Sequence, residues 1–475
     1  MRRAIVRLHS HRKGSDRVTV ETVIRGGLVA TAEATFRAEI GIEDGRITAV
    51  AQHVDGDTVI DAAGCIVLPG AIDVHTHFDT ELGDSRTADD YESGSRAAAF
   101  GGVTAFVNYA FQGEGESLRD AIARETRKAA PQSYVDFSFH PVITRVDGEV
   151  LAELEQVRDD GFTSVKVFTA VPGFQLADDD VLAILRRAAE TGMLVNVHAE
   201  DGALIEHLTA TLLEAGQREL DSLPKARPDV AEGLATEKLG IYGGETRCPI
   251  YFVHLSSVAA LDAARRARAR GAEIYIETRP IYLFLDEECY CLPGQEARKY
   301  VAWPPLRRQA DQEALWQALA LGEIQTYATD HTTWTLAQKT DPSLDFASVP
   351  GGVSNVESLL GMLYSEGVRK GRLSLSRLVA VTATNPSKLF GMWPRKGTVT
   401  VGADADLVLI DPERRVRIAS AQMQSRSDFD PYEGFEAVGW PVKTLVRGRV
   451  VVENGELLAE PGYGQLVRRG LYNRP

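Results

Sequence analysis

Two histidines, His75 and His77, lie one residue apart in the stretch AIDVHTHFDT, directly after the apolar run CIVLPGAIDV. The apolar run predicts a buried strand, and side chains two residues apart on a strand point to the same side. The two imidazoles should therefore face one common space. Imidazole nitrogens are frequent ligands of transition metals, so this spacing indicates metal-dependent chemistry.

Further polar side chains stand in or directly after other apolar stretches. They are Lys166 in TSVKVFT, His198 in LVNVHAE, His254 in PIYFVHLSS and Asp330 in IQTYATDH. A single histidine at the end of a strand is usually a satisfied structural residue. Four histidines and one carboxylate at such positions together favour a metal centre instead, and this donor set suits zinc or a similar ion.

Lys166 is unusual because it lies between Val165 and Val167 in a strand without a carboxylate. A buried ammonium group is costly and tends to lose its proton. One interpretation is a salt bridge to a carboxylate on a neighbouring strand, such as Asp330. The other is that neutral Lys166 reacts with carbon dioxide and forms a carbamate that bridges two metal ions. The residue types alone leave both open.

Eight apolar strand candidates alternate with segments of helical periodicity, such as residues 178–192 and 257–271. This alternation predicts an α/β fold, a (β/α)8 TIM barrel, whose functional residues collect at the carboxyl ends of the strands. The strand candidates are IVLPGAIDVHTH, VTAFVNY, YVDFSFHPV, TSVKVFT, LVNVHAE, PIYFVHLSS, EIYIETRP and IQTYATDH.

Both ends of the chain are rich in short strands, with turn signals at Asp44-Gly45 and Asn454-Gly455. We therefore expect one small β-sandwich domain formed from both ends. The expected division is an N-terminal extension at 1–22, the β domain at 23–62 and 392–475, and the barrel at 63–391.

The composition narrows the classes of partner. The net charge of -15 disfavours binding to nucleic acid or to an anionic membrane. No stretch reaches the about 18 apolar residues of a membrane span, and the basic N-terminus lacks the apolar segment of a signal peptide. Only four cysteines are present, which favours reduced thiols and a cytoplasmic location.

The pattern of histidines, lysine and aspartate in and after the predicted strands resembles that of the amidohydrolase superfamily in its binuclear form. Longer stretches are similar to the dihydropyrimidinase/hydantoinase family of cyclic amidases, with allantoinases and dihydroorotases as near relatives. The resemblance runs from about Val23 to the C-terminus. It rests on NVHAED, PIYFVHLSS, IETRPIYLFLDEECY, KYVAWPPLR, TDHTTWTLAQK, DFASVPGGVSNVES, TNPSKLFGMWPRKGTVTVGADADLVLIDP and PGYG.

The resemblance implies two divalent metal ions, expected to be Zn²⁺, bridged by carboxylated Lys166. One ion would be held by His75, His77, Lys166 and Asp330, and the other by Lys166, His198 and His254. A hydroxide between the ions would attack a ring carbonyl, and Asp330 would carry its proton to the leaving nitrogen. The product would be an N-carbamoyl or similar acid. The resemblance also implies a small-molecule substrate and a homotetramer or homodimer.

Four positions depart from the family pattern. Val171 replaces a tyrosine whose hydroxyl donates to the developing oxyanion, Trp303 replaces a small residue, Arg279 a cysteine and Gly351 an asparagine. The metal alone, another donor or a shifted loop would have to replace the hydroxyl, unless the substrate differs. Arg279 either forms a salt bridge at the rim or holds a substrate carboxylate or carbonyl. Together the changes predict an unusual substrate, not plain dihydrouracil.

Two alternatives stay open. The altered pocket would also suit an allantoinase-like enzyme or an amidohydrolase of non-cyclic ureides or N-acyl compounds. A non-enzymatic dihydropyrimidinase-like scaffold protein is the third reading. It is disfavoured because such relatives have lost metal ligands, whereas this chain keeps all six of the predicted ones.

Overall fold

The computed structural model describes residues 19–83 and 85–475. Its centre is one parallel sheet in the order β17-β16-β15-β14-β13-β12-β11-β8. A parallel bridge between Thr76 and His331 links the first strand to the segment after the last, which closes the predicted barrel. The strands are β8 (Ala71–Thr76), β11 (Val103–Phe111), β12 (Asp136–Val142), β13 (Ser164–Phe168), β14 (Leu194–His198), β15 (Ile250–Phe252), β16 (Ile274–Thr278) and β17 (Thr326–Tyr327).

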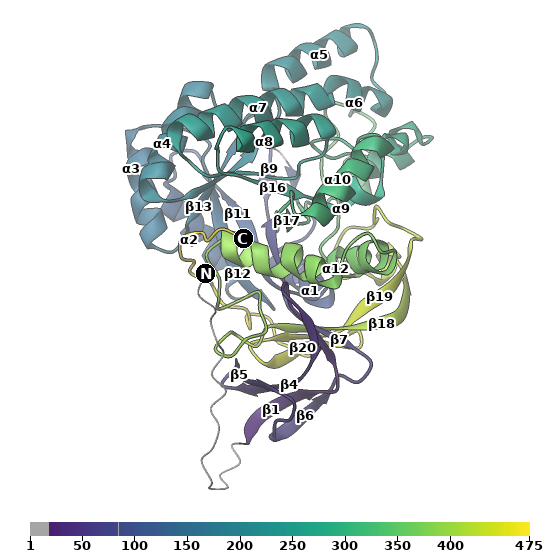
Figure 1. Cartoon of the computed structure of the whole chain (residues 1–475). Helices are drawn as coiled ribbons and strands as arrows, with labels where there is room; N and C mark the ends of the chain where they lie inside the picture. Colours follow the sequence, from purple (N-terminus) through teal and green to yellow (C-terminus); the bar gives the residue numbers. More distant parts are fainter. Residues whose placement is uncertain (1–18, 84) are drawn as a thin grey trace.

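Helices surround the barrel (Figure 1). Their ends follow local sequence signals: α4 stops at Gly192, whose φ of 73° suits glycine, and Ser257 caps the start of α8. The larger helices are α1 (Tyr91–Phe100), α2 (Leu118–Ala129), α3 (Gly148–Asp159), α4 (Asp178–Thr191), α5 (Gly202–Glu214), α7 (Asp229–Thr246), α8 (Val258–Ala269) and α10 (Gln309–Leu321). The short ones are α6 (Leu223–Ala226), α9 (Pro280–Phe284), α11 (Leu336–Lys339), α12 (Leu359–Leu363), α13 (Leu375–Val379) and α14 (Asn385–Leu389).

Both ends of the chain build the small β domain below the barrel, as predicted (Figure 1). One sheet has the order β5-β4-β1-β6, and the other β21-β20-β19-β18-β7-β2-β3. The strands are β1 (Val20–Arg25), β2 (Leu28–Ala30), β3 (Thr35–Arg37), β4 (Glu39–Glu43), β5 (Arg46–Ala51), β6 (Gly56–Asp61), β7 (Ile66–Pro69), β18 (Leu407–Arg417), β19 (Glu436–Val446), β20 (Arg449–Glu453) and β21 (Glu456–Leu457).

The two sheets share an apolar core that includes Ile24, Ile42, Val67 and Leu407. The predicted turns also form. Asp44-Gly45 joins β4 to β5, Asn454-Gly455 joins β20 to β21, and all four of these turn residues have positive φ. The exact domain boundaries stay a prediction. Of the predicted extension at 1–22, residues 1–18 lie outside the described residues, and β1 begins at Val20.

A buried group of charges joins the barrel to the β domain, and we call it the basal ion cluster: Asp136, Asp404, Asp406, Lys396 and Arg447. The Lys396 ammonium lies 2.7 Å from Asp136 and 3.3 Å from Asp404, and it also contacts Asp406. Arg447 pairs with Asp136. Asp136 is the first residue of β12, so the cluster lies at the amino ends of the barrel strands.

The C-terminal segment passes under the same end of the barrel. Its backbone bonds to Phe137 and Gly161, and its Arg469 side chain enters the barrel. There the guanidinium donates to Ser138 Oγ at 3.0 Å and to Ser164 Oγ at 2.9 Å. The segment therefore closes the amino end of the barrel with a hydrogen-bonded plug.

Two further predictions concern disulfides and membrane-spanning helices. The four cysteines form no disulfide. Within residues 19–83 and 85–475, every helix is too short or too polar to span a membrane.

Candidate metal centre and substrate cavity

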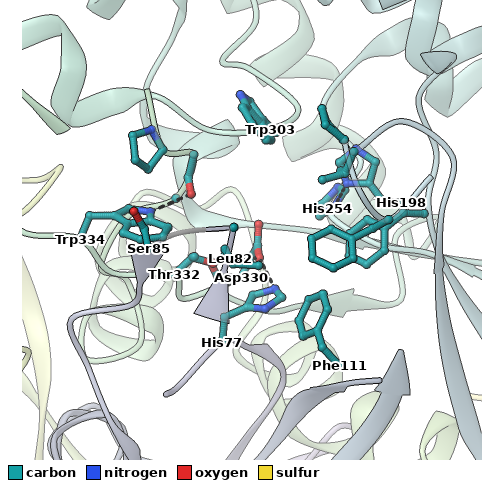
Figure 2. A pocket seen from close by; sticks show the side chains of 18 of the residues that line it. His77, Leu82, Ser85, Phe111, His198, His254, Trp303, Asp330, Thr332 and Trp334 are labelled. Carbon is teal, nitrogen blue, oxygen red and sulfur yellow. Dashed lines mark hydrogen bonds and ion pairs between the residues drawn. The ribbon is translucent and has the colours of Figure 1, made fainter. Parts of the chain in front are cut away.

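All ten predicted site residues line one cavity of about 300 Å³ (Figure 2). The cavity opens at the carboxyl ends of the barrel strands, where the fold predicts reactive groups.

 The ten residues run from His75 to Gly351 in the sequence, so only the closed barrel brings them together. They are His75, His77, Lys166, Val171, His198, His254, Arg279, Trp303, Asp330 and Gly351.

His75, His77 and Asp330 form the first group of donors. Asp330 Oδ1 lies 3.0 Å from His75 Nε2 and 3.2 Å from His77 Nε2, and the three donor atoms lie within 4.8 Å of one another. Burial lowers the pKa of His77 to about 4, so its imidazole is neutral near pH 7 and can bind a cation. His77 Nδ1 is buried without a hydrogen-bond partner. This donor set fits a divalent metal ion.

His198 and His254 form the second group. His198 Nδ1 lies 3.0 Å from His254 Nε2, and the two rings are buried. Burial, followed by the nearby His198, holds the pKa of His254 well below its usual range. His254 Nδ1 also has no hydrogen-bond partner. Two neutral imidazoles whose nitrogens face each other are suited to share a cation.

Lys166 lies between these groups at the level of the strand ends, 1% exposed. Burial lowers the pKa of its ammonium to about 7, although Glu277 and Asp330 act in the opposite direction. The Nζ atom lies 4.9 Å from the ring centre of Tyr109 and 4.8 Å from that of Phe168. A substantial fraction of Lys166 is therefore a neutral amine near pH 7.

Two of the predicted ligands have strained backbones. His254 has φ 42° and Asp330 φ 50°, both in the left-handed region that residues other than glycine rarely adopt. His254 lies two residues beyond the end of β15 and Asp330 three residues beyond the end of β17, and both line the cavity. Strain of this kind is tolerated mainly at functional sites.

Two carboxylates that orient the histidines were not predicted from the sequence. Glu277 accepts from His75 Nδ1 at 2.6 Å and from the His254 backbone N–H at 2.8 Å. Glu200 lies 2.7 Å from His198 Nε2. A carboxylate beside the outer nitrogen of a ligating imidazole fixes its tautomer and orientation. The signal was available for Glu277, a charged residue inside the apolar strand IYIET.

Arg279 pairs with Asp330 through its Nη1 and the Asp330 Oδ2 atom. The Arg279 side chain is fully buried behind Asp330. Burial by itself would raise the pKa of the Asp330 carboxyl, but Arg279 and His75 outweigh it and hold that pKa well below its usual range. The pair leaves Asp330 Oδ1 directed at the two histidines.

The other side of the cavity is apolar and aromatic. Val171 packs with Phe111, Phe168 and Phe174, so a hydrophobic contact occupies the place of the family tyrosine. Opposite His77, Trp303 lies above the cavity (Figure 2). The loop at 80–90 contributes Leu82, Gly83 and Ser85 to the lining, and residue 84 lies outside the described residues.

The Trp303 indole packs closely against the backbone of Gly351. A Cβ atom on Gly351 would lie 3.2 Å from the Trp303 indole, tighter than most such contacts. The Gly351 carbonyl accepts from Trp334 Nε1 at 2.9 Å. The glycine therefore provides the space that the large indole requires.

Comparisons with known proteins agree with this geometry. Residues 66–451 match the amidohydrolase family. The chain is 40% identical to a D-hydantoinase of Geobacillus stearothermophilus over 95% of this chain and 97% of that protein. It is 37% identical to a D-hydantoinase of Ralstonia pickettii over 96% of this chain and 100% of that protein. The crystal structure of a dihydropyrimidinase from Brevibacillus agri superposes with a TM-score of 0.94 at 38% identity, covering 96% of this chain and 100% of that chain.

Proposed function

Because this chain belongs to the amidohydrolase family, and within it to the hydantoinases, we propose that it opens a ring C–N amide bond of a hydantoin- or dihydropyrimidine-like cyclic amide or imide. The chain is a hydrolase acting on cyclic amides. The observation that carries the proposal is the convergence of four imidazoles, Lys166 and Asp330 in one cavity.

We propose two divalent metal ions, with zinc as the expected metal. His75, His77, Lys166 and Asp330 would hold one ion, and Lys166, His198 and His254 the other. Lys166 would carry a carbamate that contacts both ions. The lowered pKa of Lys166 supports this role, because only the neutral amine reacts with carbon dioxide.

Metal ions in this cavity would polarise a substrate carbonyl and lower the pKa of water. Asp330 accepts a proton from the attacking water and delivers it to the ring nitrogen as the C–N bond breaks. Arg279 holds Asp330 Oδ2, which directs the other carboxylate oxygen toward the reacting atoms. Glu277 and Glu200 hold the His75 and His198 rings in place.

The substrate is expected to differ from dihydrouracil. Val171 offers no hydrogen-bond donor to the oxyanion, and the loss of one such donor can cost about 10²–10³-fold in rate. Trp303 adds an aromatic wall. These features favour a ring with an apolar substituent that fills the aromatic part of the cavity.

The experiment is a substrate panel on zinc-loaded protein, with hydantoins, dihydropyrimidines, cyclic imides, allantoin and dihydroorotate. Ring opening of at least one cyclic amide is expected, and the Asp330→Asn variant serves as the inactive control. Hydrolysis of linear ureides or N-acyl compounds alone would contradict the cyclic substrate. Turnover of dihydrouracil equal to that of the best compound would contradict the unusual substrate only.

We also propose a homotetramer. Val230, Leu234 and Ile241 of α7 are 56%, 50% and 46% exposed and lie on one face of the helix. Exposed apolar residues gathered in this way favour contact with another protein surface. Light scattering after size exclusion should give about four chains per particle, and a monomer would contradict the proposal.

A further inference from the structure

A second cavity lies directly beside the catalytic one. It also has a volume of about 300 Å³. Most of its lining is apolar and comes from α5, α6 and a loop, including Ile205, Leu213, Leu223 and Phe346, and it opens to solvent beside α5. The two cavities share only two lining residues, Trp303 and Pro172. Trp303 is therefore a wall between them.

The Trp303 indole is held by few specific contacts. Its Nε1 is buried without a hydrogen-bond partner, so rotation of the ring breaks no hydrogen bond. One side of the ring faces Gly351, which has no side chain to block it. The other side meets Arg227, whose guanidinium lies 5.0 Å from the ring centre and is itself anchored by Glu200.

We propose that Trp303 is a movable partition and that the second cavity receives the far end of a long apolar ring substituent. The inference rests on the proposed function, since the substrate ring must sit in the catalytic cavity. The class of substrate is then a cyclic amide that carries an unbranched alkyl or arylalkyl arm. The occupant follows from the shared wall: a ligand anchored in the catalytic cavity reaches the second cavity past Trp303 and Pro172, the two residues that line both.

The first test fills the second cavity without touching the catalytic one. Ala210 is exposed on α5 and lines the second cavity only. In zinc-loaded protein, Ala210→Trp should lower kcat/KM for 5-(4-phenylbutyl)hydantoin by about tenfold or more and leave 5-methylhydantoin unchanged, because one misfitting group in an apolar pocket has an effect of this size. Ala203→Trp is the matched control, since Ala203 is exposed on the same helix and lines neither cavity.

The second test removes the partition. Trp303→Ala should raise the ratio of kcat/KM for the long compound over the short one by about tenfold. The inference is overturned if Ala210→Trp leaves that ratio unchanged, or if the unsubstituted enzyme hydrolyses only the short compound.

Direct binding separates this inference from the proposed function. Metal-depleted protein is titrated with 5-(4-phenylbutyl)hydantoin and followed by calorimetry. Weaker binding to Ala210→Trp than to Ala203→Trp supports the second cavity as a subsite, and equal binding overturns it. If zinc-loaded enzyme opens neither these two hydantoins nor any cyclic compound of the substrate panel, the proposed function fails, and the binding result still decides the subsite.

Discussion

Two buried groups of charged side chains occupy opposite ends of the same barrel, and they differ in how their polar atoms are satisfied. In the basal ion cluster, the Lys396 ammonium contacts three carboxylates, and its three donors are matched by Asp136, Asp404 and Asp406. At the carboxyl end, His77 Nδ1 and His254 Nδ1 have no partner.

Both groups contain enough donor atoms for a metal ion. The basal carboxylates are already paired with Lys396, Arg447 and Arg395, so a metal ion would have to displace these ion pairs. In the other group, burial lowers the pKa of His77, His198 and His254, and His77 and His254 have unpartnered nitrogens. Only His75 has a raised pKa, because Glu277 and Asp330 outweigh its burial. The comparison teaches that a cluster of ligand atoms predicts a metal site only where ligand atoms remain that no protein cation contacts. Arg279 takes Asp330 Oδ2, but Asp330 Oδ1 still faces the two histidines.

Removal of the metal should produce the largest effect. Dialysis against a chelator is expected to abolish ring opening, and addition of zinc should restore it, because the cavity residues alone lack a Lewis acid. Elemental analysis should find about two zinc ions per chain. Asp136→Asn is the control, and a loss of bound metal in this variant would break the distinction between the two clusters.

Substitution of one ligand should come next. His77→Asn is expected to lower kcat/KM by more than the about 10²–10³-fold that removal of a single hydrogen-bond donor causes. In metal-depleted protein its thermal unfolding should change little, since His77 Nδ1 has no partner to lose and Nε2 has only the contact with Asp330. Kinetics with zinc in excess and a melting curve check both parts. Full activity in the variant would remove His77 from the metal centre.

Substitution in the basal ion cluster should lower stability and leave activity unchanged, the opposite of the effect at His77. Lys396→Met leaves three buried carboxylates without their ammonium, which should lower the free energy of unfolding by about 3–5 kcal/mol. The folded fraction should keep its kcat. Urea unfolding measures the change, with Lys225→Met, an exposed residue of a surface pair, as the matched control. Loss of kcat at full stability would contradict a purely structural cluster.

The smallest effect is expected at the groups that orient the ligands. Glu277→Gln should reduce zinc affinity or activity by about 10–100-fold, because the amide holds the His75 ring less firmly than the carboxylate. A competition titration with a chromogenic chelator measures the affinity. An unchanged affinity together with unchanged activity would show that Glu277 does not support the metal centre.

The barrel was predictable because eight apolar strands alternate with helices and carry polar residues at their ends. Each of these signals is local. Glu277 carries a local signal, a charge inside an apolar strand, but its partner His75 is 202 positions away, and no local pattern identifies that partner. The strained backbones of His254 and Asp330 were also out of reach, since tertiary packing imposes them against local preference.

The residues that depart from the family pattern can be identified in the sequence, but the contact between two of them cannot. Gly351 and Trp303 appeared as separate changes, whereas the structure shows one fitting contact between two loops. Arg279 was expected at the rim or on a substrate group, and the structure places it beside Asp330. Its role, like those of the other site residues, stays a prediction.

The plug formed by Arg469 has a consequence for folding of the protein during its synthesis. Synthesis proceeds from the amino end, so every barrel strand has left the ribosome before Arg469 is made. Likewise β7 must wait for its antiparallel neighbour β18. Until then, sheet edges and a polar barrel interior stay open to other chains. Nascent protein should therefore depend on chaperones until translation is nearly complete.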